Sequence, residues 1–160
     1  MMFRRAVIYL AIVTLGCVLG ANLYNSIVDA PNWGASIPAS VVTTRQYFAI
    51  ADPGSFFRMV SPAAQIACLL GLIACWRLGG RIRLLAAGAL VLAVVGDIMT
   101  FAYFYPRNAL LFDPATSPEV LARVWTEWST MNHVRSAVVA TVLVCALSTL
   151  SAVERQSGDS

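Results

Sequence analysis

The chain has 160 residues, of which 59% are hydrophobic and 12% are charged, and its formal net charge is +3. A soluble domain carries about 25% charged residues, so this composition excludes an ordinary soluble protein and indicates an integral membrane protein with one domain, residues 1–160. The 11 basic residues are all arginines scattered along the chain, which argues against a nucleic-acid partner and for the lipid bilayer.

The first apolar stretch covers about residues 6–25 and follows a start that contains Arg4 and Arg5. A basic start before an apolar run resembles a signal peptide, but three further apolar runs follow, so we interpret this stretch as a retained transmembrane helix. Gly16 and Gly20 lie four residues apart on it. Small residues at helical spacing predict close packing against a neighbouring membrane helix.

Three more stretches are long and apolar enough to cross a bilayer, which takes about 20 residues. They cover about residues 59–76, 84–104 and 132–153, and the last lies within a longer predicted helix, 118–153. The last helix begins above the membrane, with Ser117 as N-cap and Glu119 favouring the first turn. The predicted fold class is therefore all-α, a four-transmembrane-helix bundle. A homo-oligomer of such bundles is compatible with the sequence.

Arginine placement predicts the orientation of the bundle. Short segments at one end of the spans are rich in arginine, so we expect both termini to be cytoplasmic, as in a bacterial inner (plasma) membrane. The outer segments, 26–58 and 105–131, are long enough to contain short helices. One is expected at about 38–50, ending before the turn Asp52-Pro-Gly54. The arginines at the cytoplasmic end are Arg4, Arg5, Arg77, Arg81, Arg83 and Arg155.

Polar residues collect in the outer half of the four predicted helices. A charge buried in lipid costs about 3 kcal/mol, so Asp97 and Arg135 should find partners, and they could pair with each other. Two interpretations remain open: a pocket roofed by the outer segments, or polar contacts that hold the bundle closed. The residues concerned are Asn22, Asn25, Gln65, Asp97, Trp128, Asn132, His133 and Arg135, with Trp33 in the adjoining outer segment.

The tryptophans and cysteines each have a simpler reading. Trp33, Trp125 and Trp128 could form an aromatic belt at the membrane interface instead of stacking on a ligand. The cysteines lie in apolar runs without a C-x-x-C pair, and the chain has one histidine. We therefore predict free thiols in the apolar core, no metal site and no cofactor. The cysteines are Cys17, Cys68, Cys75 and Cys145.

Several short motifs resemble the membrane family DUF1772, the anthrone-oxygenase-like proteins. They are Asn22-Leu-Tyr-Asn25, Asn32-Trp33 followed by Ile37-Pro38, Asp52-Pro-Gly-Ser-Phe-Phe-Arg58, and Trp125-x-x-Trp-Ser-x-x-Asn-His-x-Arg135. The resemblance implies a four-helix membrane protein. It also implies oxidation of a polycyclic anthrone to an anthraquinone without metal or flavin.

Such chemistry would need a base and donors for an oxyanion. We expect His133 or Asp97 to serve as the base, and Arg135 and Asn132 to stabilise the oxyanion. The ligand would be a small apolar aromatic molecule, such as an anthrone or quinone. The alternatives are a membrane protein that binds a lipid or hydrophobe without catalysis, and a structural protein that binds a partner. The expected substrate-binding residues are Asn22, Asn25, Gln65, Trp33, Trp128 and Asn132.

Overall fold

The computed structural model describes residues 2–158, and within that range the chain is helical without β-strands. Two elements, η1 and η2, are π-helical turns that continue an α-helix without a break in the chain direction. The elements in order are α1 Met2–Tyr24, η1 Asn25–Asp29, α2 Ala30–Gly34, α3 Ala39–Tyr47, α4 Pro53–Cys75, α5 Gly80–Met99, η2 Thr100–Phe104, α6 Tyr105–Phe112 and α7 Pro118–Gly158.

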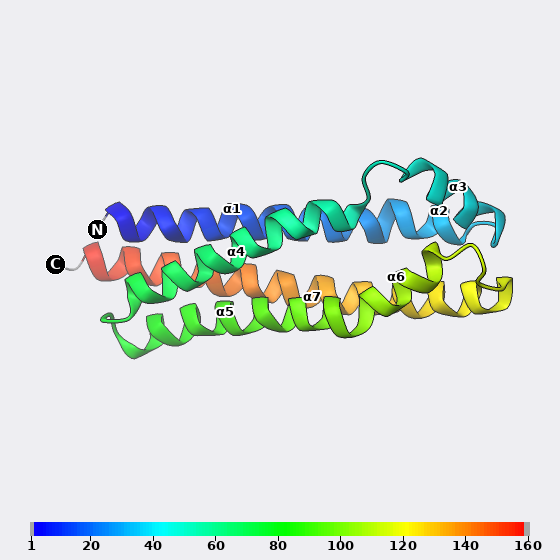
Figure 1. Cartoon of the computed structure of the whole chain (residues 1–160). Helices are drawn as coiled ribbons and strands as arrows, with labels where there is room; N and C mark the ends of the chain where they lie inside the picture. The colour runs from blue at the N-terminus through cyan, green and yellow to red at the C-terminus, as the bar shows by residue number, and fades with distance from the viewer. Residues whose placement is uncertain (1, 159–160) are drawn as a thin grey trace.

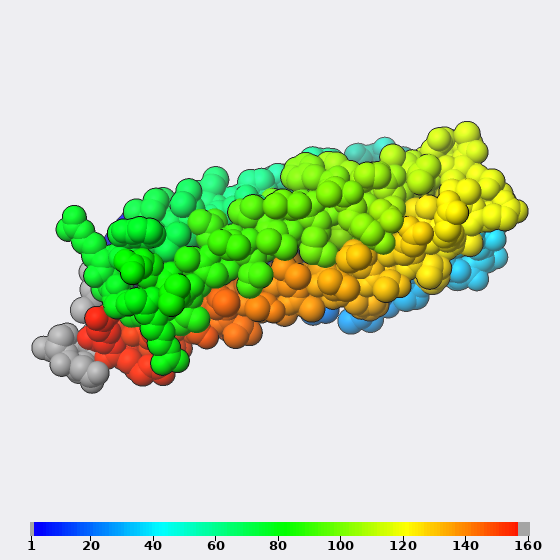
Figure 2. All heavy atoms as spheres, turned by 90° about the horizontal axis from the view of Figure 1, so that it is seen from below, coloured from blue at the N-terminus to red at the C-terminus, as the bar shows by residue number. Residues whose placement is uncertain are grey.

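Four helical rods are long and apolar enough to cross a membrane: 2–34, 53–75, 80–112 and 118–156. This confirms the predicted all-α bundle of four spanning helices. Both termini lie at one end of an elongated molecule, which we call the terminal end (Figure 1). The opposite, extended end is formed by α2, α3, α6 and the first part of α7. Figure 2 shows the continuous α5–η2–α6 rod lying along α7.

Helix α4 begins earlier than the predicted start near residue 59. Asp52 is its N-cap: the carboxylate accepts a hydrogen bond from the Ser55 backbone N–H at 2.7 Å, and Pro53 occupies the first turn. Proline suits this position because the missing N–H has no helical partner there. The segment that we interpreted as a turn is thus a helix start, which makes Arg58 part of α4.

The first and third rods also extend beyond their predicted bounds, because an aromatic cluster buries their outer ends. Trp33 of α2, Leu111 of α6 and Trp128 of α7 are among its buried members. Arg45 of α3 ties this region together by donating from Nε to the Leu111 carbonyl at 2.8 Å. Hydropathy alone ends both spans early, because a charged residue interrupts each apolar run there, Asp29 in the first and Arg107 in the third.

Alanines, not the predicted glycines, form the close packing within the membrane-spanning part. Ala64, Ala67 and Ala89 are buried in its central cluster. A Cβ built on Gly16 or Gly20 would meet no atom within 4 Å outside its own helix. The prediction that these two glycines permit close helix contact is therefore wrong.

Gly34 is the glycine that a neighbour does require. The ring of Trp125 lies against it, and the indole N–H of Trp125 donates to the Ala30 carbonyl at 2.8 Å. A Cβ on Gly34 would overlap the indole ring. The absence of a side chain therefore allows α2 to lie directly on α7.

We predict that Gly34→Ala destabilises the extended end by about 1–3 kcal/mol, as overpacking does in other cores. Thermal unfolding in mild detergent, followed by tryptophan fluorescence, measures the change. Gly20→Ala is the matched control, because its Cβ would enter open space. Equal melting temperatures for the two variants would contradict the packing of Trp125 on Gly34.

The N-cap of α4 leads to a second prediction, which concerns how the stability of the fold depends on pH. Burial acts to raise the pKa of Asp52, but hydrogen bonds from the Ser55 hydroxyl and backbone, together with Arg58, outweigh it and leave the pKa below its usual value. The ionised carboxylate thus stabilises the fold above the unfolded-state pKa of about 4, and this contribution is lost as the pH falls through the lower folded-state pKa.

Asp52→Asn keeps a side-chain acceptor for the cap but has no charge that titrates. Its melting temperature should therefore fall less steeply at acidic pH than that of the unmodified protein. Asp52→Ala should lower stability throughout by about 1 kcal/mol or less, since the carboxylate side chain is 41% exposed. Circular dichroism melts at several pH values measure both. If Asp52→Asn lost as much melting temperature at acidic pH as the unmodified protein, Asp52 would not be the cause of that loss.

Candidate functional site

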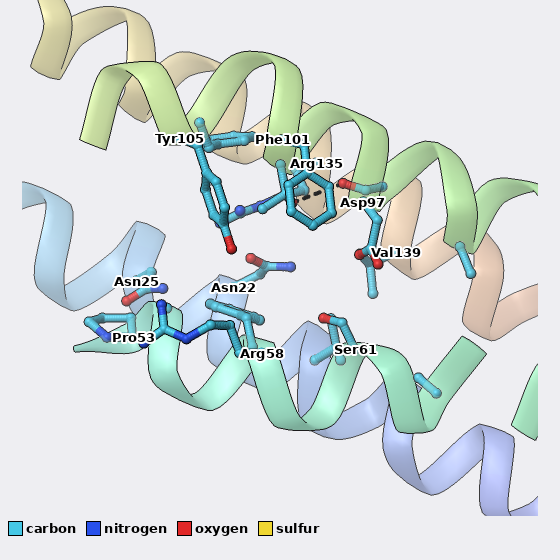
Figure 3. Close-up of a pocket in the computed structure, with 18 of the residues that line it drawn as sticks. Asn22, Asn25, Pro53, Arg58, Ser61, Asp97, Phe101, Tyr105, Arg135 and Val139 are labelled. Atoms are coloured by element: carbon cyan, nitrogen blue, oxygen red, sulfur yellow. Dashed lines mark hydrogen bonds between the residues drawn. The ribbon is translucent and has the colours of Figure 1, made fainter. Parts of the chain in front are cut away.

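A cavity of about 210 Å³ lies inside the bundle, near where the four rods meet the extended end. Figure 3 shows side chains from α1, η1, α4, the α5–η2–α6 rod and α7 that point into it. Apolar residues of the central cluster, Leu15 and Val142 among them, line its inner limit. Trp33 and Trp128 close it at the extended end. Residues far apart in the chain therefore share one mainly apolar space.

Arg135 is the buried cation of this cavity, with 6% of its surface exposed. Its guanidinium carbon lies 4.0 Å from the ring centre of Phe104 and 5.3 Å from that of Phe57. Its Nη2 donates to the side-chain oxygen of Asn132, while its Nε is buried without a hydrogen-bond partner. Ring faces attract a cation, so the two phenylalanines hold the guanidinium without neutralising it.

Asp97 is the carboxylate of the same cavity, and it accepts a hydrogen bond from the Gln65 side chain. Among residues 2–158 the ion pairs are Arg58 with Asp52 and Arg107 with Glu127. The pairing that we considered between Asp97 and Arg135 is therefore not formed. Both charges face the cavity, and each is held by a neutral amide.

Further polar groups around the cavity have unused hydrogen-bonding capacity. Asn22 is 1% exposed, and its side-chain oxygen is buried without a partner. The Asn25 amide and the Tyr105 hydroxyl also line the cavity, and neither makes a side-chain hydrogen bond within the described part of the chain. Buried polar groups are normally paired, and Asn22 and Asn25 are buried, so unpaired groups on these two side chains are typical of a site that binds a polar ligand atom or water.

Both π-helical turns lie at the cavity. Asn25 belongs to η1, and Thr100, Phe101 and Phe104 belong to η2. A π-turn inserts one extra residue into a helix, and such turns often occur at functional sites. The consecutive polar residues Asn25 and Ser26 of η1 are both buried, so this turn places polar groups on the inner side of the first rod.

An aromatic group forms the outer wall. The ring centres of Trp33 and Trp128 are 5.1 Å apart, those of Phe104 and Trp128 are 5.7 Å apart, and the Trp128 indole N–H donates to Asn108 at 2.9 Å. Trp33 and Trp128 are buried. These two tryptophans are therefore part of the cavity wall and the core of the extended end, not an exposed interfacial belt.

With this geometry described, we compared the chain with known proteins. A family model described as "Anthrone oxygenase" matches residues 54–145, which is more than half of the chain. The chain belongs to the anthrone oxygenase family. Comparisons with curated proteins and with solved structures found no match. The matched segment contains Gln65, Asp97 and Arg135. Asn22 and Asn25 lie outside it.

In this anthrone oxygenase family member most of the expected site residues meet at the cavity, but His133 and Asn132 do not line it. His133 is exposed on the outer surface of α7. Asn132 is fully buried behind Arg135, where its amide nitrogen donates to the Ser26 hydroxyl at 2.7 Å and to the Asn22 carbonyl at 3.3 Å. The expected residues that do line the cavity are Asn22, Asn25, Trp33, Gln65, Asp97, Trp128 and Arg135.

Sequence reasoning missed the phenylalanines that hold Arg135. Phe57 lies within the Asp52-Pro-Gly-Ser-Phe-Phe-Arg58 motif, which we had placed in a loop, and Phe104 is an ordinary apolar residue of a spanning stretch. The early helix signal at Asp52 was the available clue to Phe57. No sequence signal distinguished Phe104 from its apolar neighbours.

The four cysteines are free in the structure. Cys68 and Cys75 are buried and Cys145 is half-buried, but Cys17 is exposed, so the expectation of core thiols is wrong for Cys17. Across residues 2–158 no three His, Cys, Asp or Glu side chains come together as a metal-ligand group.

Asn132 gives a third prediction. Removing its amide in Asn132→Ala leaves the buried Arg135 guanidinium without its side-chain hydrogen bond, which costs about 1–3 kcal/mol for the unsatisfied group, whereas the Ser26 hydroxyl keeps its bond to the Asn22 carbonyl. Thermal unfolding in detergent measures the loss. Thr141→Ala is the control, because the Thr141 hydroxyl is exposed and bonds only within its own helix. Similar stability losses in the two variants would exclude a structural role for the Asn132 network.

Proposed function

We propose that the cavity binds a small, planar aromatic ketone and that the protein oxidises it with O₂ to a quinone. The observation that carries the proposal is the placement of Asp97 and Arg135 on one cavity without an ion pair between them. Charges buried in a membrane protein usually pair with each other or mark a functional site. Membership of the anthrone oxygenase family supports the same chemistry.

In this proposal Asp97 is the general base. An anthrone has acidic C–H bonds opposite its carbonyl, and loss of one proton gives an electron-rich enolate. Gln65 binds one side of the Asp97 carboxylate and so orients the carboxylate toward the ligand. His133 has no such position, because it is exposed and does not line the cavity.

Arg135 stabilises the oxygen on which the negative charge develops. A preorganised donor in a water-poor site stabilises such an oxyanion more than water does. Phe57 and Phe104 hold the guanidinium in place. Because Arg135 is not paired with a carboxylate in the described chain, its charge remains available to the ligand.

The reaction balances with O₂ as the only co-substrate. The enolate carbon reduces O₂ and forms a C–O bond, which gives a hydroperoxide after protonation by Asp97. Loss of the second C–H proton, with cleavage of the O–O bond, forms the new carbonyl and releases water. In sum, one anthrone and one O₂ give one anthraquinone and one H₂O, and Asp97 returns to its ionised form.

The same observations bear on two simpler functions, a structural bundle and a binding protein without catalysis. A purely structural bundle would have its polar residues closed on one another, whereas here unpaired groups surround a cavity. A protein that binds a hydrophobe without turnover would have the same apolar lining, and the activity assay separates it from an oxygenase. The proposal includes an orientation in which the arginine-rich terminal end is cytoplasmic in a bacterial inner membrane.

Mutation of the charged pair tests the proposal. In oxygen-electrode assays with anthrone in detergent, Asp97→Asn should lower kcat by about 10²–10⁴. Arg135→Gln should lower it by about 10²–10³. His133→Ala should leave the rate unchanged and serves as the control. Formation of anthraquinone, followed by its absorbance, must account for the O₂ consumed.

Three outcomes would count against the proposal. Full activity of Asp97→Asn would exclude Asp97 as the base, and loss of activity in His133→Ala would point to the histidine. Quenching of tryptophan fluorescence by anthraquinone without any turnover of anthrone would favour the non-catalytic binding protein.

A further inference from the structure

We infer that the cavity receives its ligand sideways from the bilayer, through a gap between α4 and the α5–η2–α6 rod, and that Phe101 and Tyr105 control access. This inference rests on the proposed function only for the identity of the ligand. The path itself follows from where the exposed lining residues lie.

Exposure of the lining residues locates the opening. Those supplied by α1, η1, α2 and α7 are all buried. The exposed ones come from α4, which supplies Arg58 and Pro62, and from η2 and α6, which supply Phe101 and Tyr105. The opening therefore lies on the side where α4 faces the third rod, away from the contact between α1 and α7.

The extended end does not offer an equal path. Trp33, Phe104 and Trp128 close the cavity there, and each is less than 10% exposed. Their ring contacts form one packed group with the apolar residues of α6 and α7. A ligand from water would have to separate this cluster or pass the ion pair of Asp52 and Arg58 at the half-exposed start of α4, whereas a ligand from the side meets apolar residues that are already exposed.

The level of the opening matches the boundary between lipid tails and headgroups. Phe101 lies about 27 Å along the helix from Arg83, taking about 1.5 Å per residue, and the hydrocarbon core of a bilayer is about 30 Å thick. Tyrosine is enriched at this boundary, which suits Tyr105. A planar aromatic ketone, apolar with a polar edge, collects at the same depth.

Phe101 and Tyr105 stand at the opening itself. Their ring centres are 5.0 Å apart in an edge-to-face arrangement, and 62% of the Phe101 surface is exposed. Figure 3 shows both side chains projecting from the rod that carries them into the space that α4 borders. Pro62 on α4 lies inside a helix, where proline removes a backbone hydrogen bond and bends the helix.

Cysteine labelling tests the path without any substrate. In a Cys17→Ala background, Ser61→Cys places a thiol in the cavity wall, and the same background without Ser61→Cys reports labelling of the native thiols. Purified protein in phosphatidylcholine vesicles is treated with pyrene maleimide, which dissolves in the bilayer, or with a charged, water-soluble maleimide. We expect the lipid-dissolved reagent to label Ser61→Cys severalfold faster than the charged one.

Substitutions at the opening should change that rate. Phe101→Ala and Tyr105→Ala should accelerate labelling by pyrene maleimide severalfold, and Phe101→Trp should slow it. Ile98→Ala and Ile98→Trp are the matched controls, because Ile98 is 57% exposed on the same rod but does not line the cavity. Thermal melts of each variant confirm that it is folded.

Three results would overturn the inference: faster labelling by the charged reagent, no labelling of Ser61→Cys by either reagent, or equal effects of the Phe101 and Ile98 substitutions. The labelling assay is independent of turnover. Failure of the oxygenase assay with normal labelling would therefore reject the proposed function and leave the lateral path intact.

Discussion

The structure of the cavity depends on the hydrogen bonds of Asn132. This buried amide donates to the Ser26 hydroxyl and the Asn22 carbonyl, and it accepts a hydrogen bond from Arg135. It thus links α7 to the first rod at the depth where η1 widens the helix. The link also fixes the guanidinium between two phenylalanine rings, so the charged wall of the cavity and the contact between the first and last helices have one origin.

Hydropathy and helical spacing predicted the four rods and several of the polar and aromatic residues that line the cavity. Long apolar runs must be helical in a bilayer, because every backbone polar group needs a partner within the chain. Asn22, Gln65, Asp97 and Arg135 could be found for the related reason that polar residues in an apolar run rarely face lipid. Their common depth followed from counting helical turns inward from the outer ends of the predicted spans.

The errors came from local structure that the apolar pattern does not encode. A one-residue difference along α7 separates Asn132, which is buried, from His133, which is exposed, and the chemistry alone offered both His133 and Asp97 as the base. The cap formed by Asp52 moved the start of α4 outward and brought Phe57 to the cavity. Partner choice was also beyond the sequence. Asp97 binds Gln65 of the neighbouring helix α4, and Arg135 binds Asn132 one turn earlier on α7, so each charge is bonded to a neutral amide and not to the opposite charge.

The cavity wall is built from two parts of the chain with different duties. Gln65, Asp97 and Arg135, the groups suited to proton transfer and charge stabilisation, come from the second, third and fourth rods. Asn22, Asn25 and Trp33, which shape the other side, come from the first rod and its extension. If the cavity acts as proposed, a change of ligand can arise in the first third of the chain without altering Asp97 or Arg135, so that one reaction centre would serve molecules of different outline.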